Sequence, residues 1–491
     1  MRSTFFGFNI ARTGLFTAQR ALDVVGHNIA NAQTPGYSRQ RVEQTQLSPL
    51  AIPGGRGMLG AGVEAIRITQ IRNEFLDVKF RNENTSFGEW QTRYETLSEI
   101  EAIINEPSNS GIRNVMDEFF SSIQELSKDP SSLTVRALVR QRAIAFCNTI
   151  NHMYRQFEKM ARDMDFAIKT TVSQINNYAK DIAKLNDAIY RAELDGSSAN
   201  DLRDQRNLLI DNLSKLVKVE ITEIKDPNLS NSGSGKMSIL INGQALVSHD
   251  KVDLLNLENR TEHPHIDGVM IGNLRWDSGS TIDISGLNGQ LRAQFDMRDN
   301  ADGNFKGIPY YINKLNEFTK EFAKEFNKVH SEGYGLSDTG TGNNFFDIGS
   351  VAARDIKISQ LIEMDLDYIA AAKNAYEDGR GIPGDGSNAL LLSKIRDNHN
   401  MFDWGSPDDF LKSLVSNLGV DAQEARRMSE NQEILIQQVD YQRQSISGVS
   451  LDEEMANMIK FQHSYNAAAR MITAMDEMID VLINRLGRVG L

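Results

Sequence analysis

Both ends of the chain carry apolar residues at a seven-residue spacing, and this pattern restricts the fold more than any other feature of the sequence. In residues 8–32 it forms two rows, made of Phe8, Leu15, Leu22 and Ile29 and of Ala11, Ala18, Val25 and Ala32. A row that repeats every seven residues lies along one face of a helix and packs against a partner helix. The segment is therefore predicted to be a helix with a coiled-coil seam.

The C-terminal segment shows the same pattern and contains neither Gly nor Pro from residue 451 to residue 486. Its rows consist of Leu451, Met458, Tyr465, Ile472, Ile479 and Leu486 and of Phe461, Ala468, Met475 and Leu482. Only Glu454 interrupts the second row, at its start. We expect a long helix with a coiled-coil seam that forms contacts between elements or subunits. An ordinary amphipathic core helix is the alternative interpretation.

The sequence between the two ends predicts further long helices. Residues 133–195 are predicted to form a very long helix or two abutting ones, because they contain neither Gly nor Pro and isoleucines recur at sevenfold spacing. Residues 80–105, 310–330 and 421–445 are also predicted to be helical. Together they indicate a mainly α fold, a long helical bundle that closes around inserted segments.

One inserted segment, residues 219–298, changes to the short alternating runs of β-strands, with hairpin turns such as Asn242-Gly243. Four strands are expected, at 219–224, 237–241, 252–257 and 281–284. Residues 336–405 are rich in Gly, Asp and Asn and are expected to be loops. The expected division is a coiled-coil domain (1–45 and 449–491), a bundle (46–218, 299–335 and 406–448), a β-rich domain (219–298) and a loop-rich segment (336–405).

The charge balance excludes two classes of partner. The chain has 53 basic and 66 acidic residues, a net charge of −13. Nucleic acid and anionic membranes require a basic surface, so neither is expected as a partner. No apolar run is long enough to cross a membrane, and charged residues interrupt any N-terminal signal peptide. Cys147 is the single cysteine and is expected to be a packed thiol rather than a nucleophile.

Candidate catalytic and ligand-binding motifs lack the context that their chemistry needs. The glycines of 55–60 match a dinucleotide pattern, but no strand precedes them and no helix follows. Gly235-Lys236 lacks the remaining residues of a phosphate loop, and His263 with His265 lacks further metal ligands. His27 and His463 have no nucleophile nearby in the sequence. No catalytic residue, metal or cofactor is therefore expected.

The stretch from Asn28 to Gln40 resembles a known signature. Its residues Asn28, Asn31, Thr34, Pro35, Gly36 and Tyr37 stand as in the N-terminal signature of flagellar rod, hook and hook-associated axial proteins. The segments 8–15, 445–454 and 461–470 are similar to the hook-associated members at the junction between hook and filament, and residues 384–389 match them loosely. The chain is thus identified as a member of the axial family.

The resemblance implies a non-enzymatic structural subunit of the bacterial flagellum. Such proteins leave the cell unfolded through the flagellar type III apparatus. Their N- and C-terminal helices pair into an inner layer around the export channel, their long helices form a second layer, and their β domains face outwards. The implied partners are further copies in a ring, the hook protein, hook-associated protein 3 as the second junction protein, and an export chaperone. A hook or rod component is the near alternative, and an enzyme with a coiled-coil regulatory region is the distant one.

Overall fold

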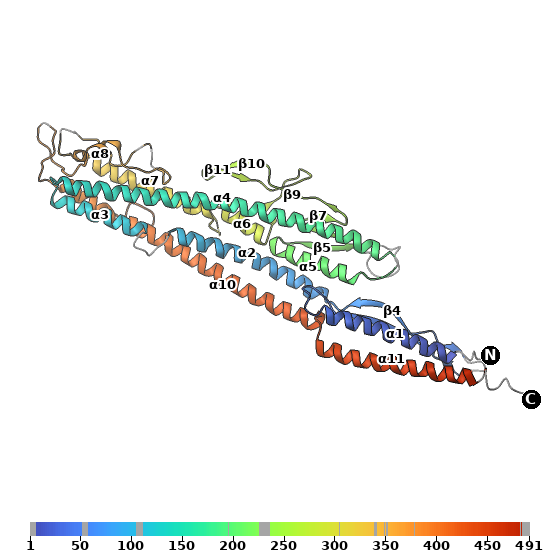
Figure 1. Ribbon diagram of the computed structural model, residues 1–491. Helices are drawn as coiled ribbons and strands as arrows, with labels where there is room; N and C mark the ends of the chain where they lie inside the picture. Colours follow the sequence, from blue (N-terminus) through green and yellow to red (C-terminus); the bar gives the residue numbers. More distant parts are fainter. Residues whose placement is uncertain are drawn as a thin grey trace, which may run out of the picture. The chain divides into compact units, whose positions relative to one another are not determined.

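The computed structural model describes residues 6–51, 57–104, 111–194, 196–224, 236–303, 305–337, 341–347, 349, 352–377, 379–481 and 483. The chain forms two compact units, each assembled from separate stretches of sequence. Unit 1 contains Met1–Ser86, Gln174–Leu254 and Gln432–Leu491, and unit 2 contains Phe87–Ser173 and Leu255–Asn431. Both termini therefore belong to unit 1 (Figure 1).

Helices make up most of the structure, which confirms the predicted mainly α fold with paired terminal helices and an inserted β region. They are α1 (Phe6–Ala30), α2 (Glu74–Ile104), α3 (Ile112–Lys128), α4 (Leu133–Ala192), α5 (Asn200–Leu216), α6 (Gln290–Asp299), α7 (Ile308–Ser331), α8 (Gln360–Met364), α9 (Ser387–Lys394), α10 (Pro407–Ser447) and α11 (Leu451–Asp480). The stretch without Gly or Pro forms one helix, α4, of 60 residues. Uninterrupted backbone hydrogen bonding explains its length.

Unit 1 contains three small antiparallel sheets. The first pairs β1 (Gln40–Gln46) with β4 (Val63–Gln70), and the second pairs β2 (Leu50–Ala51) with β3 (Met58–Leu59). The third has four strands in the order β5 (Glu220–Ile224), β6 (Lys236–Ile241), β7 (Gln244–Ser248) and β8 (Lys251–Val252). Asn242 and Gly243 both have positive φ angles, 49° and 80°, as the predicted two-residue hairpin requires.

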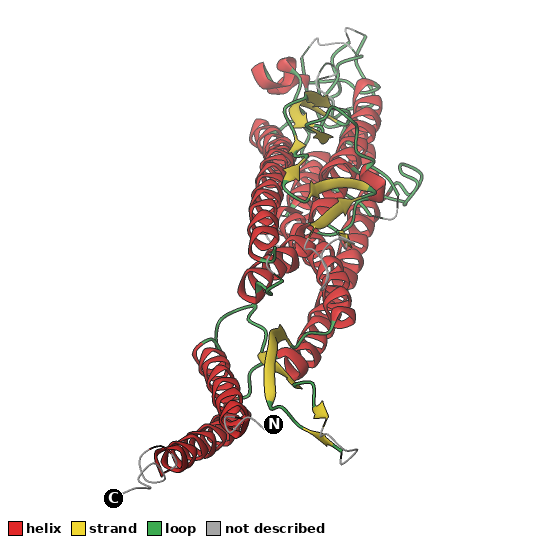
Figure 2. Ribbon diagram, turned by 90° about the vertical axis from the view of Figure 1, so that its right-hand side faces the viewer, coloured by secondary structure: helices red, strands yellow, loops and turns green. Residues whose placement is uncertain are grey.

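Unit 2 contains the remaining strands of the described residues, as two-stranded sheets. Figure 2 shows the strands of the molecule in yellow among the helices in red. They are β9 (Leu255–Asn256) with β12 (Arg275–Trp276), and β10 (Arg260–His263) with β11 (Ile266–Gly272). The predicted strand at 252–257 is therefore divided between β8 and β9. The predicted strand at 281–284 is wrong, because the Asp283 carboxylate accepts the Ser285 N–H and starts the 3₁₀ turn η1 (Ile284–Gly286).

A cluster of phenylalanines fills the core of unit 2. Phe119 of α3, Phe146 of α4, and Phe322 and Phe326 of α7 are fully buried. The ring centroids of Phe146 and Phe322 lie 5.0 Å apart, and those of Phe119 and Phe326 lie 5.5 Å apart. Cys147 is buried in the same core, and burial raises the pKa of its thiol to about 12. As predicted, this cysteine is a packed thiol.

The region 331–405 adds the short helices α8 and α9, η2 (Leu366–Tyr368) and η3 (Ile395–Asp397). Two buried side chains hold part of it in place. Arg136 of α4 donates to the carbonyl oxygens of Leu366 (3.1 Å) and Ile369 (2.7 Å). His330 Nε2 accepts the Ala370 N–H (2.9 Å), so the proton sits on Nδ1, which donates to the Asn343 carbonyl (2.8 Å).

Unit 2 is expected to lose stability in mild acid because of His330. Burial lowers the pKa of His330 from 6.5 to about 4. The neutral ring therefore contributes its full stabilisation above about pH 6.5, and this contribution falls as the pH decreases to about 4, by about 3 kcal/mol. Hydrogen exchange of residues 366–372, corrected for intrinsic rates, should show the loss.

The control for this pH dependence is a substitution at His463, which is exposed on α11. His330→Gln should be less stable at neutral pH but should lack the decline between pH 6.5 and 4, whereas His463→Gln should retain it. A decline of equal size in His330→Gln would assign the acid sensitivity to other groups.

Candidate functional site

The two terminal helices of the chain lie side by side and run antiparallel (Figure 1). Gly7 of α1 faces Met475 of α11, and Gly14 faces Ala468. Further along, Asn28 contacts Glu454. Each step of seven residues forward along α1 is thus a step of seven residues back along α11. The pair keeps one heptad register from end to end.

The face of α11 that meets α1 is the predicted row. Met458, Phe461, Tyr465, Ile472, Met475 and Ile479 are half-buried, and Ala468 is buried. Phe461 shares the heptad row of Met475 and Ala468, which contact α1. The second row lies three positions earlier and consists of Met458, Tyr465, Ile472 and Ile479. Leu482 and Leu486 lie outside the described residues. The use of this face between subunits stays a prediction.

The face of α1 that meets α11 is narrower than predicted, and its side chains are smaller. It is formed by Gly7, Ala11, Gly14, Ala18, Ala21, Val25 and Asn28. The predicted residues Phe8, Leu15, Leu22 and Ile29 are only half-buried and lie on one flank of this face, and Ala32 follows the end of the helix. Small side chains on α1 therefore receive the large side chains of α11, which allows the two backbones to approach closely.

The signature residues form the turn that follows α1. The Thr34 and Tyr37 N–H groups donate to the carbonyl oxygens of Asn31 (2.9 Å) and Thr34 (3.2 Å). Gly36 has a φ angle of +79°, and a Cβ there would come within 3.0 Å of the Leu208 side chain. Only glycine fits this turn without strain. Thr34, Pro35 and Gly36 are exposed, whereas Tyr37 turns back towards α1.

Asn28 is the centre of this arrangement and is 1% exposed. Its amide nitrogen donates to the Gln40 carbonyl (2.9 Å) and to Glu454 Oε2 (3.0 Å). Its amide oxygen accepts the Tyr37 hydroxyl (2.8 Å) and the Gln40 N–H (3.0 Å). One side chain thereby joins the end of α1, the start of β1 and the start of α11.

Arg39 ties the same turn to two C-terminal helices. Its backbone N–H donates to the carbonyl oxygen of Ser447, the last residue of α10 (2.8 Å). Its guanidinium pairs with Glu454 (2.7 Å) and with both carboxylate oxygens of Glu453 (2.9 and 3.0 Å). Glu454 is 1% exposed. We call Asn28, Tyr37, Arg39, Glu453 and Glu454 the terminal clasp.

The clasp explains why an acidic residue interrupts an apolar row. Glu454 occupies a seam position, but there it meets Asn28 and Arg39 rather than apolar side chains. Hydrogen bonding to Glu453 and the charge of Glu454 raise the pKa of Arg39 although burial opposes this. Burial and nearby carboxylates raise the pKa of Tyr37. Sequence reasoning missed Arg39 and Glu454, and the interruption itself was the only signal.

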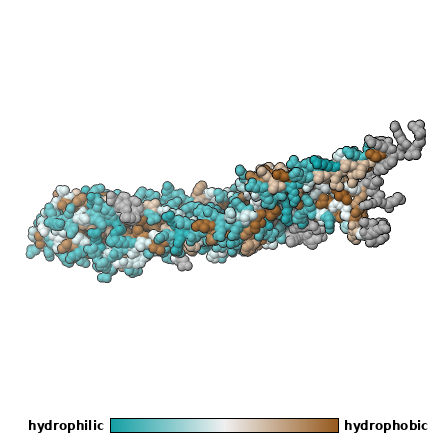
Figure 3. Space-filling model, turned by 90° about the horizontal axis from the view of Figure 1, so that it is seen from below, coloured by the Kyte–Doolittle hydropathy of each residue, from teal (hydrophilic) through white to brown (hydrophobic). Residues whose placement is uncertain are grey.

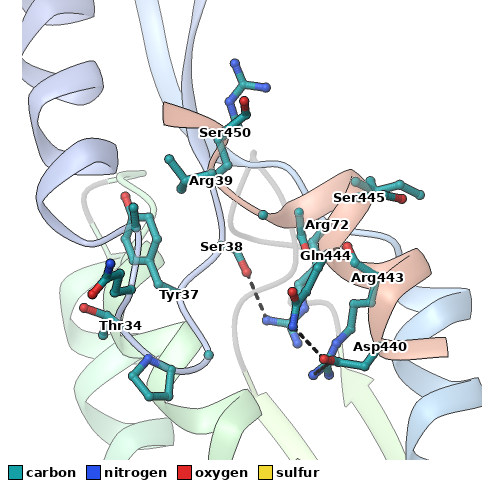
Figure 4. A pocket seen from close by; sticks show the side chains of 18 of the residues that line it. Thr34, Tyr37, Ser38, Arg39, Arg72, Asp440, Arg443, Gln444, Ser445 and Ser450 are labelled. Carbon is teal, nitrogen blue, oxygen red and sulfur yellow. Dashed lines mark hydrogen bonds and ion pairs between the residues drawn. The ribbon is translucent and has the colours of Figure 1, made fainter. Parts of the chain in front are cut away.

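A cavity of about 500 Å³ adjoins the clasp. Figure 4 shows Tyr37 and Thr34 on one side of it and Asp440, Arg443 and Gln444 on the other. Its charges pair with one another. Arg72 binds Asp77 (2.6 Å), and Arg443 binds Asp440 (2.9 Å) and also pairs with Asp211. These ion pairs join helices. Beside them, the Tyr37 hydroxyl lies 2.9 Å from Nδ1 of His27, whose Nε2 is 3.5 Å from the Asp201 carboxylate.

The other motifs considered from the sequence give no site in the described part of the chain. No group of three or more His, Cys, Asp or Glu side chains among these residues is placed to hold a metal ion. His263 is buried, with Nε2 3.0 Å from the Arg298 carbonyl oxygen, and burial lowers its pKa. Residues 55–56 and 233–235 lie outside the described residues. None of the described helices combines the length and apolar character needed to cross a membrane.

Comparisons with known proteins first define the class. The ends of the chain match the family profiles for flagella basal body rod protein (residues 8–37) and for the C-terminal part of flagellar basal body rod FlgEFG protein (residues 442–486). These segments contain α1 with the signature turn, and α11. They are the ends of a flagellar axial protein, as predicted.

Further matches define the particular family. The helical domain of flagellar hook-associated protein FlgK matches residues 97–346, over half of the chain. Flagellar hook-associated protein 1 of Bacillus subtilis is 34% identical over the whole of both chains. That of Escherichia coli is 26% identical over 97% of this chain and 99% of its own. The chain belongs to the family of flagellar hook-associated protein 1.

A solved structure supports the fold. The flagellar hook junction protein FlgK from Burkholderia pseudomallei superposes with a TM-score of 0.63 at 14% identity, over 75% of this chain and all of that one. The predicted function, a structural subunit of the bacterial flagellum of the hook-associated protein 1 type, is therefore confirmed at the level of the family.

The glycines of α1 should differ in their tolerance of larger side chains. A Cβ at Gly14 would lie 4.0 Å from the Ala468 Cβ, whereas nothing lies within 4 Å of a Cβ at Gly26. Alanine at either position should stabilise α1 by about 0.5–1 kcal/mol through helix propensity. Leucine should be tolerated at Gly26 but should separate the helices at Gly14. Hydrogen exchange of α1 measures both effects, and equal protection in Gly14→Leu and Gly26→Leu would contradict the seam.

Removing the Asn28 side chain should open the clasp. Asn28→Ala deletes four hydrogen bonds and leaves buried partners unsatisfied, at a cost of about 3 kcal/mol. Denaturant unfolding of unit 1 should show this loss, and exchange of the Gln40 amide should become faster. Asn9→Ala, at an exposed position of the same helix, is the matched control. Equal stability of the two variants would show that the clasp contributes nothing.

Proposed function

We propose that the chain forms the junction between hook and filament by packing its paired terminal helices against those of neighbouring copies. One observation carries this proposal. After α1 and α11 have paired, large apolar side chains remain exposed on both, namely Phe16, Met455, Ile459, Met471, Met478 and Val481. Exposed apolar surface of this extent on one pair of helices is typical of a protein interface.

The proposed partners are those that the family resemblance implies. Copies of the chain form a ring, with the hook protein on one side and hook-associated protein 3 on the other. An export chaperone holds the C-terminal region before secretion through the flagellar type III apparatus. A single buried cysteine fits unfolded export, because folding at the destination requires no disulfide. We also propose that the protein has no enzymatic activity, since the polar groups at the clasp pair with one another.

The proposed domain arrangement follows the segments expected from the sequence. Residues 1–45 and 449–491 form the inner layer, the long helices form a second layer, and the β-rich segment 219–298 faces outwards. The pairing of α1 with α11 supports the inner layer. The division of the β strands between two compact units means that the β-rich segment is a set of small sheets supported by helices.

Deletion of the gene tests the function. Cells without the protein should make hooks without filaments and release filament protein into the medium, as electron microscopy and analysis of the medium would show. Normal filaments in the deletion strain would contradict the proposal.

Complementation of that strain tests the helices. Ile472→Asp places a carboxylate in the half-buried seam, so filaments should remain absent, because an unpaired charge in an apolar contact is costly. Asn466→Asp adds the same charge at an exposed position of α11 and should restore filaments. The sheet β5–β8 should stay folded in both variants. Normal filaments with Ile472→Asp would show that the seam of the terminal helices is not needed for the proposed assembly.

A further inference from the structure

The outer side of α11 carries a shallow apolar hollow that no described residue covers. It is lined by Ala474, Glu477, Met478 and Val481 and measures about 420 Å³. Met471 adjoins it one turn earlier. Met471, Met478 and Val481 are 49%, 56% and 42% exposed. Figure 3 shows apolar side chains on the face near the chain ends. We call Met471, Ala474, Glu477, Met478 and Val481 the α11 hollow.

The outer side of α1 carries an apolar ridge instead. Phe16 is 56% exposed, and Phe8 and Leu15 are half-buried on the flank of the seam. Arg12 stands between them and is exposed. These residues are neighbours on the helix surface, because positions three, four and seven apart share one side. We call Phe8, Arg12, Leu15 and Phe16 the α1 ridge.

The hollow and the ridge lie on opposite sides of the helix pair. Phe8 and Leu15 each follow a seam residue of α1 by one position, whereas Met471 and Met478 each precede a seam residue of α11 by one position. One position turns the direction by 100° on a helix. The ridge is thus rotated by +100° from the seam of α1, and the hollow by −100° from the seam of α11. Because the helices are antiparallel, these two rotations point to opposite sides of the plane that contains both helix axes. One copy can therefore contact a different neighbour on each side.

The charges of the two helices are complementary. Helix α1 contains Arg12, Arg20 and Asp23, a net charge of +1. Helix α11 contains six acidic residues with Lys460 and Arg470, a net charge of −4. At the two surfaces themselves, Arg12 borders the ridge and Glu477 borders the hollow. Neither side chain forms an ion pair or hydrogen bond with another described residue.

We infer that the α11 hollow of one copy receives the α1 ridge of the next copy, with Arg12 paired to Glu477 across the contact. This inference rests on the proposed self-assembly and names the surfaces that perform it. Because the two surfaces differ, the contact is heterologous, and repeating it produces a ring or a helical tube rather than a closed dimer. An aromatic side chain that enters a methionine-lined hollow also buries a large apolar area.

Charge reversal in the full-length chain tests the contact. Arg12→Glu and Glu477→Arg each place like charges across it, and each should weaken self-association about tenfold at low salt, as measured by sedimentation. A 1:1 mixture of the two variants should recover wild-type association. In alternating order, every contact in the mixture joins opposite charges. The double variant should recover for the same reason.

Lys460→Glu is the matched control, because it reverses a charge on α11 about 21 Å along the axis from Ala474. It should leave association unchanged, and circular dichroism should show that all variants fold. If the wild type associates and the single variants match it, or if the mixture stays weak, the inferred contact is wrong. If the wild type shows no association, the proposed self-assembly fails instead.

Disulfide cross-linking tests whether the same contact exists in the assembled junction. With Arg12→Cys and Glu477→Cys in one chain, oxidation of isolated hook–filament junctions should produce a ladder of linked copies. Each single variant should produce none, because Cys147 is buried. Junctions that form but give no ladder would overturn the inference.

Discussion

The buried carboxylate of Glu454 is the interaction on which the terminal part of the fold depends. It is desolvated, so it requires compensation, and Arg39 and Asn28 supply a charge and a hydrogen bond. Because Arg39 also holds the last carbonyl of α10, the same residue positions two consecutive helices. The contact between Asn28 and Glu454 then sets which residues of the antiparallel helices α1 and α11 face each other. A shift by one turn would leave Glu454 buried without a partner.

The seam between the terminal helices depends on a difference in size. On α1, Gly7 leaves room for Met475 of α11, and Gly14 faces Ala468. Glycine lowers the intrinsic stability of α1, so this helix gains its order from the partner that it approaches closely. The larger residues of α1 are displaced to the flank, where they remain available for contacts with other molecules. Packing within the chain and packing between chains thus use different residues of the same helix.

The parts of the fold that were predicted correctly are those that leave a hydropathy pattern in the sequence. The α11 seam was predicted well from Met458 to Ile479, because its residues are large and apolar, whereas Leu451 at the start of the predicted row is 48% exposed. Three of the seven residues of the α1 face, Ala11, Ala18 and Val25, were predicted, since Gly7 and Gly14 carry no hydropathy signal and Phe8 and Leu15 carry a strong one. Arg39 and Glu454 could not be connected, because 415 positions separate them and no local pattern links them. The prediction of a strand at 281–284 was wrong for a local reason, because the Asp283 carboxylate caps a 3₁₀ turn there.

Asn28 and Glu454 are 426 positions apart, and this distance has a consequence for how the molecule matures. The first partner is made early and must wait for nearly the entire polypeptide before its contact exists. A chain that stops short of α11 leaves Asn28 and Arg39 without their carboxylate partners. This contact can therefore form only in a chain that extends into α11.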